Sequence, residues 1–217
     1  MSIKMTNQYD EDYFLNGIKS GKSNYVDYSW KPELTMPMAE SVRDVMGILF
    51  SGESILDVGC ARGYLVKALR KLRIEAYGYD ISKWALDNCD PDVKEFVSNC
   101  LGDKKHQFIF SKDCFEHIPE PDLAVLVDRL IDKCLMSMLV IVPLSFIDGS
   151  SYVRKEDDMD STHVIRWPLH TWMDFFQNRA GRQFTVSGSW HIEGLKPTSF
   201  THPKSCGFIT LQRSLPN

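Results

Sequence analysis

The chain has 217 residues, 43% of them hydrophobic, which is enough to bury the core of one domain. Its 25 Lys and Arg residues against 29 Asp and Glu residues give a net charge of −4, so composition does not favour the broad basic surface that nucleic-acid binding requires. The six cysteines form no C-x-x-C pair, which argues against a zinc knuckle or a disulfide framework. No apolar run reaches the membrane-spanning length of about 20 residues, which argues against a membrane anchor. Because the N-terminus also lacks the basic-then-apolar layout of a secretion signal, we expect a cytoplasmic protein.

Hydrophobic periodicity predicts strands and helices that alternate through the middle of the chain, as they do around a parallel sheet. In chain order, strands are expected over residues 54–58, 76–79, 93–97, 107–110, 138–142, 184–190 and 207–211. Helices are expected over residues 37–49, 63–72, 82–89, 119–131 and 167–181. The last two strands, separated by the polar segment 191–203, are expected to pair as an antiparallel hairpin. The predicted fold class is α/β, a doubly wound, seven-stranded, mostly parallel sheet that this hairpin closes.

The turn after the first expected strand carries the strongest signal for a ligand. An apolar run around Asp57 is followed by small residues at every second position, Gly59, Ala61 and Gly63. Small side chains let a turn backbone approach a ligand closely, and glycine takes φ values that other residues avoid. The dinucleotide pattern G-x-G-x-x-G is not matched, because position 64 is Tyr, and a G-x-x-x-x-G-K-[ST] phosphate loop is absent. We therefore expect a nucleoside-bearing cofactor of another kind.

A second acidic residue ends the next expected strand. Asp80 lies 23 residues after Asp57, in the segment A-Y-G-Y-D-I-S that covers residues 76–82. A carboxylate about 20 residues beyond the first turn is placed to accept hydrogen bonds from ribose hydroxyls. Ser82, two residues later, suits the N-cap of the following helix.

A third segment, F-I-F-S-K-D-C-F-E-H-I-P over residues 108–119, completes a resemblance. Together with I-L-D-V-G-C-A-R-G over residues 55–63, it resembles the class I S-adenosylmethionine (SAM) methyltransferase superfamily. The likeness covers residues 55–142, and Ala61 stands where the superfamily usually has its central glycine. It implies a Rossmann-like methyltransferase fold with SAM as the cofactor, Asp80 on the ribose and Ile81 on the adenine face. Asn99 would offer its amide oxygen to the adenine amino group, where many members have an acidic residue. The cofactor-binding residues that the resemblance implies are Asp57, Gly59, Cys60, Ala61, Gly63, Asp80, Ile81, Asn99 and Ser111.

The chain is expected to form a single methyltransferase domain, residues 1–217, with three parts. Residues 1–50 would supply an aromatic lid and a capping helix, since Tyr and Trp residues there alternate with flexible Gly and Ser residues. Residues 51–145 would form the SAM-binding core. Residues 146–217 would supply an acceptor-side insertion and the closing hairpin. For the helix over residues 37–49, simple capping of the sheet edge remains an equal alternative.

Methyl transfer from a sulfonium needs donor and acceptor in line, and an oxygen or nitrogen acceptor often needs a base. Histidine is the natural candidate, and we single out His163, His117 and Asp113 as candidate catalytic residues. His117 has a structural alternative, in which its ring only ties the loop to the backbone. In a further alternative, Asp113, Glu116, His117 and His163 would hold a divalent metal, as in metal-assisted ribose methyltransferases that this cluster resembles. The less specific interpretation, in which the two carboxylates cap the helix after Pro119, is favoured over a metal.

The sequence thus predicts a SAM-dependent methyltransferase that produces S-adenosylhomocysteine. The expected acceptor is a hydroxyl of a small or medium-sized molecule. Alternatives are methylation of an RNA end or another nucleic acid, and a catalytically silent SAM-binding partner subunit. No membrane partner is expected, and the sequence predicts neither the acceptor's identity nor the oligomeric state.

Overall fold

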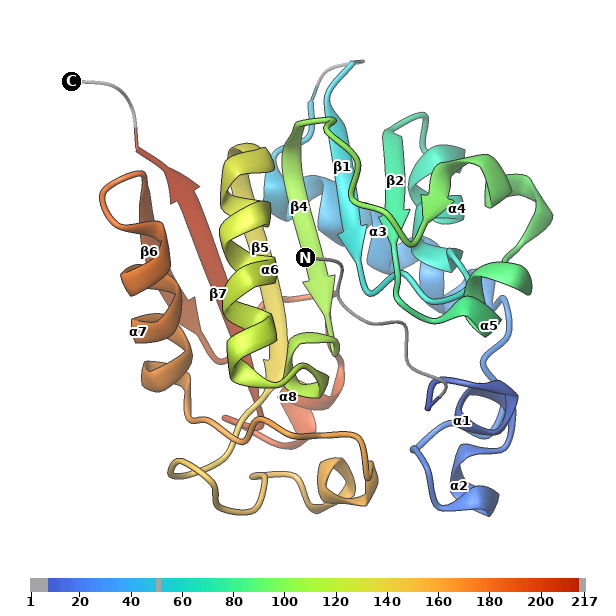
Figure 1. Ribbon diagram of the computed structural model, residues 1–217, viewed down its shortest axis with the longest axis vertical. Helices are drawn as coiled ribbons and strands as arrows, with labels where there is room; N and C mark the ends of the chain where they lie inside the picture. The colour runs from blue at the N-terminus through green and yellow to red at the C-terminus, as the bar shows by residue number, and fades with distance from the viewer. Residues whose placement is uncertain (1–7, 50–51, 215–217) are drawn as a thin grey trace.

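Seven strands form one sheet within residues 8–49 and 52–214, which are the residues that the computed structural model describes. They lie in the order β3-β2-β1-β4-β5-β7-β6 (Figure 1). Their bounds are β1 Ser54–Val58, β2 Glu75–Tyr79, β3 Val97–Ser98, β4 His106–Lys112, β5 Cys134–Pro143, β6 Phe184–Ser189 and β7 Cys206–Arg213.

The direction of the strands confirms the predicted fold class. β1 pairs in parallel with both β2 and β4, β2 with β3, and β4 with β5. β7 lies between β5 and β6 and runs antiparallel to both, so the C-terminal hairpin closes a mostly parallel sheet. β3 and β6 lie at the two edges of the sheet, and β4 is its middle strand, between β1 and β5.

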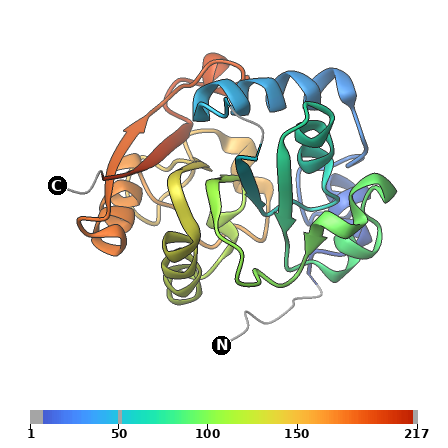
Figure 2. The same ribbon diagram turned by 90° about the horizontal axis from the view of Figure 1, so that it is seen from above.

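Helices cover both faces of this sheet. α6 and α7 pack on one face, and α3 and α4 pack on the other (Figure 2). None of the helices in the described parts of the chain is long and apolar enough to cross a membrane. The helix bounds are α1 Glu11–Leu15, α2 Gly17–Ser20, α3 Pro32–Met46, α4 Tyr64–Lys71, α5 Lys83–Asp87, α6 Glu120–Lys133, α7 Leu169–Ala180 and α8 Thr198–Thr201, with 3-10 helices η1 Pro91–Phe96, η2 Phe115–His117 and η3 Lys155–Met159.

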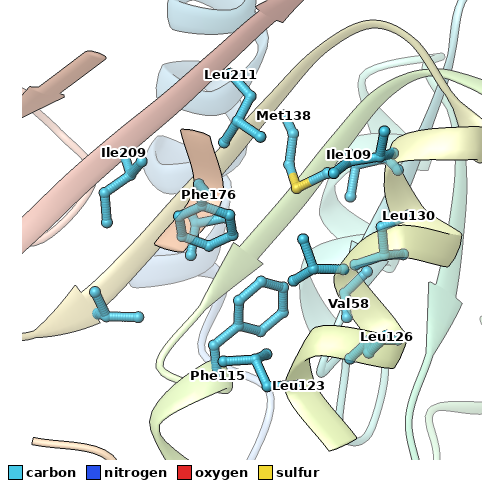
Figure 3. Packing of buried hydrophobic residues seen from close by; sticks show 14 of the residues in the cluster. Val58, Ile109, Phe115, Leu123, Leu126, Leu130, Met138, Phe176, Ile209 and Leu211 are labelled. Atoms are coloured by element: carbon cyan, nitrogen blue, oxygen red, sulfur yellow. The ribbon is translucent and has the colours of Figure 1, made fainter. Parts of the chain in front are cut away.

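The apolar stripe of α6 explains how that helix docks. Leu123, Leu126 and Leu130 recur at helical spacing and are at most 1% exposed. They face Ile109 of β4 and Met138 of β5 across one hydrophobic cluster (Figure 3). Phe176 of α7 joins the same cluster, so the two helices and the sheet share one core on this face.

Two sequence predictions about local structure are wrong. The strand expected over residues 93–97 is mostly the 3-10 helix η1, because Pro91 presets φ for a first helical turn and the Asp90 side chain accepts from the Asp92 amide at 3.0 Å. Only Val97–Ser98 pairs with β2. The helix expected over residues 37–49 begins at Pro32, which takes the first helical position, and keeps Pro37 inside it.

The N-terminal segment and the β5–α7 connection meet beyond the carboxyl ends of the parallel strands (Figure 1). Asn24 Nδ2 donates to the Glu156 carbonyl at 2.6 Å, and Ser161 Oγ donates to the Lys22 carbonyl at 3.3 Å. Two segments far apart in sequence are therefore joined above the edge where open α/β sheets bind ligands. Residues 1–7, 50–51 and 215–217 lie outside the described residues. They belong to the expected segments 1–50, 51–145 and 146–217.

Candidate active site

A cavity of about 620 Å³ lies at the carboxyl ends of β1, β2 and β4. Its position matches the crevice in which open α/β sheets bind their ligands. The wall includes eight of the residues that the sequence analysis singled out: Asp57, Gly59, Cys60, Ala61, Asp80, Ile81, Asp113 and His117.

Glycine is required in the turn after β1 for steric reasons. Gly59 has φ of 84°, and a Cβ there would lie 2.6 Å from the Cβ of Cys114. Gly63 has φ of 75° at the start of α4, and a Cβ there would lie 2.8 Å from a Val93 methyl. Ala61 keeps the same left-handed backbone with φ of 48°, so its methyl group does not change the path of the turn. The turn is thus held tightly against η1 and the loop after β4.

Asp80 links this turn to the end of β2. Its Oδ2 accepts the Ala61 amide and its Oδ1 accepts the Ser82 amide, both at 2.7 Å. Burial raises the pKa of Asp80, and the backbone hydrogen bonds partly oppose that rise. Burial and the neighbouring Asp80 charge raise the pKa of Asp57 to about 7. Two desolvated acidic groups under one cavity favour a ligand that carries positive charge.

Aromatic side chains of the N-terminal segment cover the cavity. Tyr13 and Phe14 of α1 line it and are each 5% exposed. Phe14 stacks on Trp84 with ring centroids 5.5 Å apart, and Tyr28 stacks on Tyr64 at the same separation. The cover therefore rests on α4 and α5, the helices that follow the two ligand-facing turns.

Asp113 is held between two lysines. It follows β4 with φ of 51°, accepts from Lys112 Nζ at 2.6 Å and also pairs with Lys196 Nζ. Burial alone would raise the pKa of Asp113, but the two ammonium groups lower it well below its usual range. Lys196 is 8% exposed and comes from the β6–β7 connection. Asp113 is therefore a charged, already paired carboxylate and a poor proton acceptor.

Glu116, His117 and His163 form a tight group next to the cavity. Glu116 is fully buried, and neither of its oxygens has a hydrogen-bond partner within residues 8–49 and 52–214. Its Oε1 lies 4.0 Å from His117 Nε2 and 3.9 Å from His163 Nε2. Burial raises the pKa of Glu116 well above its usual value, whereas burial and the second ring lower the pKa of His117 to about 4. Burial also lowers the pKa of His163.

The same three residues could hold a divalent metal. One ligand atom from each lies within 4.8 Å of the others, and an unpaired buried carboxylate is the kind of group that a cation would satisfy. Asp113, the fourth residue of the expected cluster, is instead engaged by Lys112 and Lys196.

Four expected site residues do not line the cavity. Gly63 packs against Val93 of η1. The Ser111 hydroxyl donates to the Val58 carbonyl at 2.9 Å, which ties β4 to β1. Asn99 is exposed just beyond β3. His163 packs behind His117, with ring centroids 4.5 Å apart. Lys196 and Asp160 are residues of this region that the sequence analysis did not single out. Both lie in polar connections, so their residue types gave no sign that they are buried.

Comparison with known proteins agrees with this architecture. A family described as "Methyltransferase domain" matches residues 33–187. No curated protein matches the chain. Among solved structures, a SAM-dependent methyltransferase from Archaeoglobus fulgidus is 16% identical with a TM-score of 0.59, over 84% of this chain and 97% of that one.

Two further structures show how widely the fold is used. A magnesium protoporphyrin IX methyltransferase from Synechocystis, solved with bound SAM, is 12% identical with a TM-score of 0.56, over 82% of this chain and 79% of that one. A chain of the Pnkp1/Rnl/Hen1 RNA repair complex is 16% identical with a TM-score of 0.56, over 81% of this chain and 42% of that one. Identities this low establish the fold alone. Because the family match spans most of the chain and covers β1 to β5 and most of the cavity wall, the chain belongs to the methyltransferase domain family and is a SAM-dependent methyltransferase.

Proposed function

We propose that the protein transfers the methyl group of SAM to a hydroxyl of a small or medium-sized acceptor inside this cavity. The observation that carries the proposal is that Asp80 and His117 line the same cavity. That space has room for a donor and an acceptor under the same aromatic cover, and the cover would exclude water from the reaction.

The cofactor half of the proposal rests on the turn and the two acidic groups. Asp80 would accept the ribose hydroxyls while Ile81 packs on the adenine. The backbone of Gly59, Cys60 and Ala61 would approach the donor closely, since no side chain projects from Gly59. The acidic groups Asp57 and Asp80 would favour the cationic sulfonium donor over its neutral thioether product.

The acceptor half rests on His117. Its ring lines the cavity, and its pKa of about 4 keeps the imidazole neutral at pH 7, so the ring would orient an acceptor hydroxyl and take its proton only as the methyl group is transferred. A proton on Nε2 would place a positive charge 4.0 Å from Glu116 Oε1, which would favour the ionised form of that buried carboxyl. His163 would support this pair from behind, and Asp113 would shape the wall through its lysine partners. In-line geometry supplies most of the rate, because the sulfonium is already activated.

A second candidate is metal-assisted transfer, favoured by the unpaired Glu116 oxygens. Glu116, His117 and His163 would hold a divalent ion, which would lower the pKa of an acceptor hydroxyl. An RNA end is the acceptor class that goes with this alternative, since one similar structure belongs to an RNA repair complex. The net charge of −4 does not favour that acceptor.

The test combines binding and turnover. Calorimetric titration with SAM should show saturable binding, and transfer of a labelled methyl group should occur to a member of a panel of phenols, sugars and other small hydroxylated molecules. A short RNA, assayed with and without a chelator, covers the second candidate. Transfer only to the RNA, or only with added metal, would replace the first candidate with the second. No SAM binding at all would overturn both.

A further inference from the structure

A chain of hydrogen bonds runs from the N-terminal cover to His117. The Tyr13 hydroxyl of α1 donates to Asp160 Oδ2 at 3.0 Å. Thr162 donates its hydroxyl to Asp160 Oδ1 at 2.5 Å and its amide to the same oxygen at 2.9 Å. His117 Nδ1 lies 2.7 Å from the Thr162 hydroxyl oxygen. Asp160 is 5% exposed, so water has little access to replace any of these partners.

Counting protons along this chain fixes the state of the His117 ring. A carboxylate only accepts, and a threonine hydroxyl has one proton to give. If that proton points to Asp160, the Thr162 oxygen must accept from His117, so Nδ1 carries the hydrogen. The opposite arrangement would place two acceptor oxygens 2.5 Å apart, without a proton between them. A neutral ring with hydrogen on Nδ1 has its lone pair on Nε2.

The lone pair therefore lies on the Nε2 edge of the ring, opposite the edge that contacts Thr162. Nε2 lies 4.0 Å from Glu116 Oε1, and the ring lines the cavity. The other tautomer would carry hydrogen on Nε2, which could neither take a proton from an acceptor nor bind a cation. The direction of one threonine hydroxyl thus decides whether His117 is available for chemistry.

We infer that Asp160 is a positioning residue that acts through Thr162 to hold His117 as the Nδ1–H tautomer, and that Tyr13 couples this arrangement to the seating of the N-terminal cover. This inference rests on the proposed function and deepens it. Of the residues joined by these hydrogen bonds, Tyr13 belongs to the N-terminal cover. It supplies one of the three donors that orient the Asp160 carboxylate. A displaced cover leaves Asp160 Oδ2 without its hydroxyl partner, so the base is best prepared only when the cavity is closed.

The tautomer can be measured without turnover. Long-range proton–nitrogen correlation spectra of 15N-labelled protein, with His117 assigned by comparison with His117→Gln, should show hydrogen on Nδ1 in the wild type. Thr162→Val and Asp160→Ala should each give the Nε2–H form or a mixture, while Thr162→Ser should restore the wild-type pattern. A wild-type ring with hydrogen on Nε2, or an unchanged Nδ1–H ring in both Thr162→Val and Asp160→Ala, would overturn the inference.

Kinetics supply an independent readout. Thr162→Val should lower kcat about tenfold to a hundredfold, the range typical for residues that orient a functional histidine, with little change in SAM affinity. Thr171→Val is the matched control, because Thr171 makes the same hydroxyl-to-carboxylate bond, to Asp148 at 2.9 Å, on an exposed surface. Equal rates for the two variants would contradict the inference. Wild-type protein that shows the Nδ1–H ring but binds no SAM would instead refute the proposed function alone.

Coupling to the cover is tested by a double-mutant cycle. Tyr13→Phe should lower kcat less than Asp160→Ala does, and the double variant should lose less than the product of the two effects, because both changes act on one carboxylate. Strictly multiplicative effects would show that Tyr13 acts independently of the chain.

Discussion

Replacing Asp80 with alanine tests the proposed position of the cofactor. The wild-type carboxylate accepts two backbone amides at 2.7 Å and still lines the cavity, where its remaining lone pairs would accept the ribose hydroxyls. A hydrogen bond to a charged group contributes about 1.5–3 kcal/mol, and each 1.4 kcal/mol changes affinity about tenfold. We therefore expect Asp80→Ala to weaken SAM binding between about tenfold and a hundredfold.

The assay is calorimetric titration with SAM and, separately, with S-adenosylhomocysteine. Asp87→Ala is the matched control, since Asp87 is an exposed carboxylate in the neighbouring helix α5 that pairs only with Lys83 among the described residues. Circular dichroism at the titration temperature establishes that the variant is folded, because Asp80→Ala also leaves the amides of Ala61 and Ser82 without their acceptor. An Asp80→Ala affinity equal to that of Asp87→Ala would refute the ribose assignment.

Three further predictions concern the acceptor side and the stability of the sheet. His163→Ala should lower the initial rate of methyl transfer and leave SAM affinity in titration nearly intact, because His163 packs behind His117 rather than on the cofactor side. Lys196→Met should lower the free energy of unfolding in urea by about 2 kcal/mol, less than a fully buried ion pair would lose, since Asp113 is only half-buried and still pairs with Lys112. Burial lowers the pKa of His106 to about 4, so the unfolded chain binds the proton first as pH falls. Stability should therefore fall below pH 6.5, and between pH 7 and pH 5 the wild type should lose about 2 kcal/mol more than His106→Gln.

Each of these has a result that contradicts it. A wild-type rate in His163→Ala would remove that residue from the reaction. An unfolding free energy for Lys196→Met within about 0.5 kcal/mol of the wild type, the usual range for surface substitutions, would show that the buried pair is energetically neutral. Parallel stability curves for the wild type and His106→Gln would show that this histidine is not desolvated.

The parts of the site that are local in sequence could be predicted. Asp57, the turn through Gly63 and Asp80 sit in strand–turn–helix units whose hydrophobic pattern and small residues dictate the backbone. The apolar stripe of α6 was likewise visible, and all its members are buried. The strand expected over residues 93–97 failed because Pro91 and the Asp90 cap outweighed the apolar pattern of Val93 and Phe96.

The contacts that prepare the chemistry could not be predicted. Lys196 reaches Asp113 across 83 residues, and Tyr13 reaches Asp160 across 147. Lysine in a polar connection and aspartate in an acidic run are normally solvated, so neither residue type signals burial. The sequence singled out His117 and His163 as candidate catalytic residues, but their ring contact depends on how the β5–α7 connection folds back.

Under the proposed function, the cavity at the ends of β1 and β2 holds the adenosyl group with its sulfur facing His117. A crystal structure with S-adenosylhomocysteine tests it most directly. We expect the ribose hydroxyls on Asp80, the adenine against Ile81, and the sulfur within reach of an acceptor that touches His117 Nε2. A cofactor bound elsewhere, or in this cavity with its sulfur turned away from His117, would contradict it.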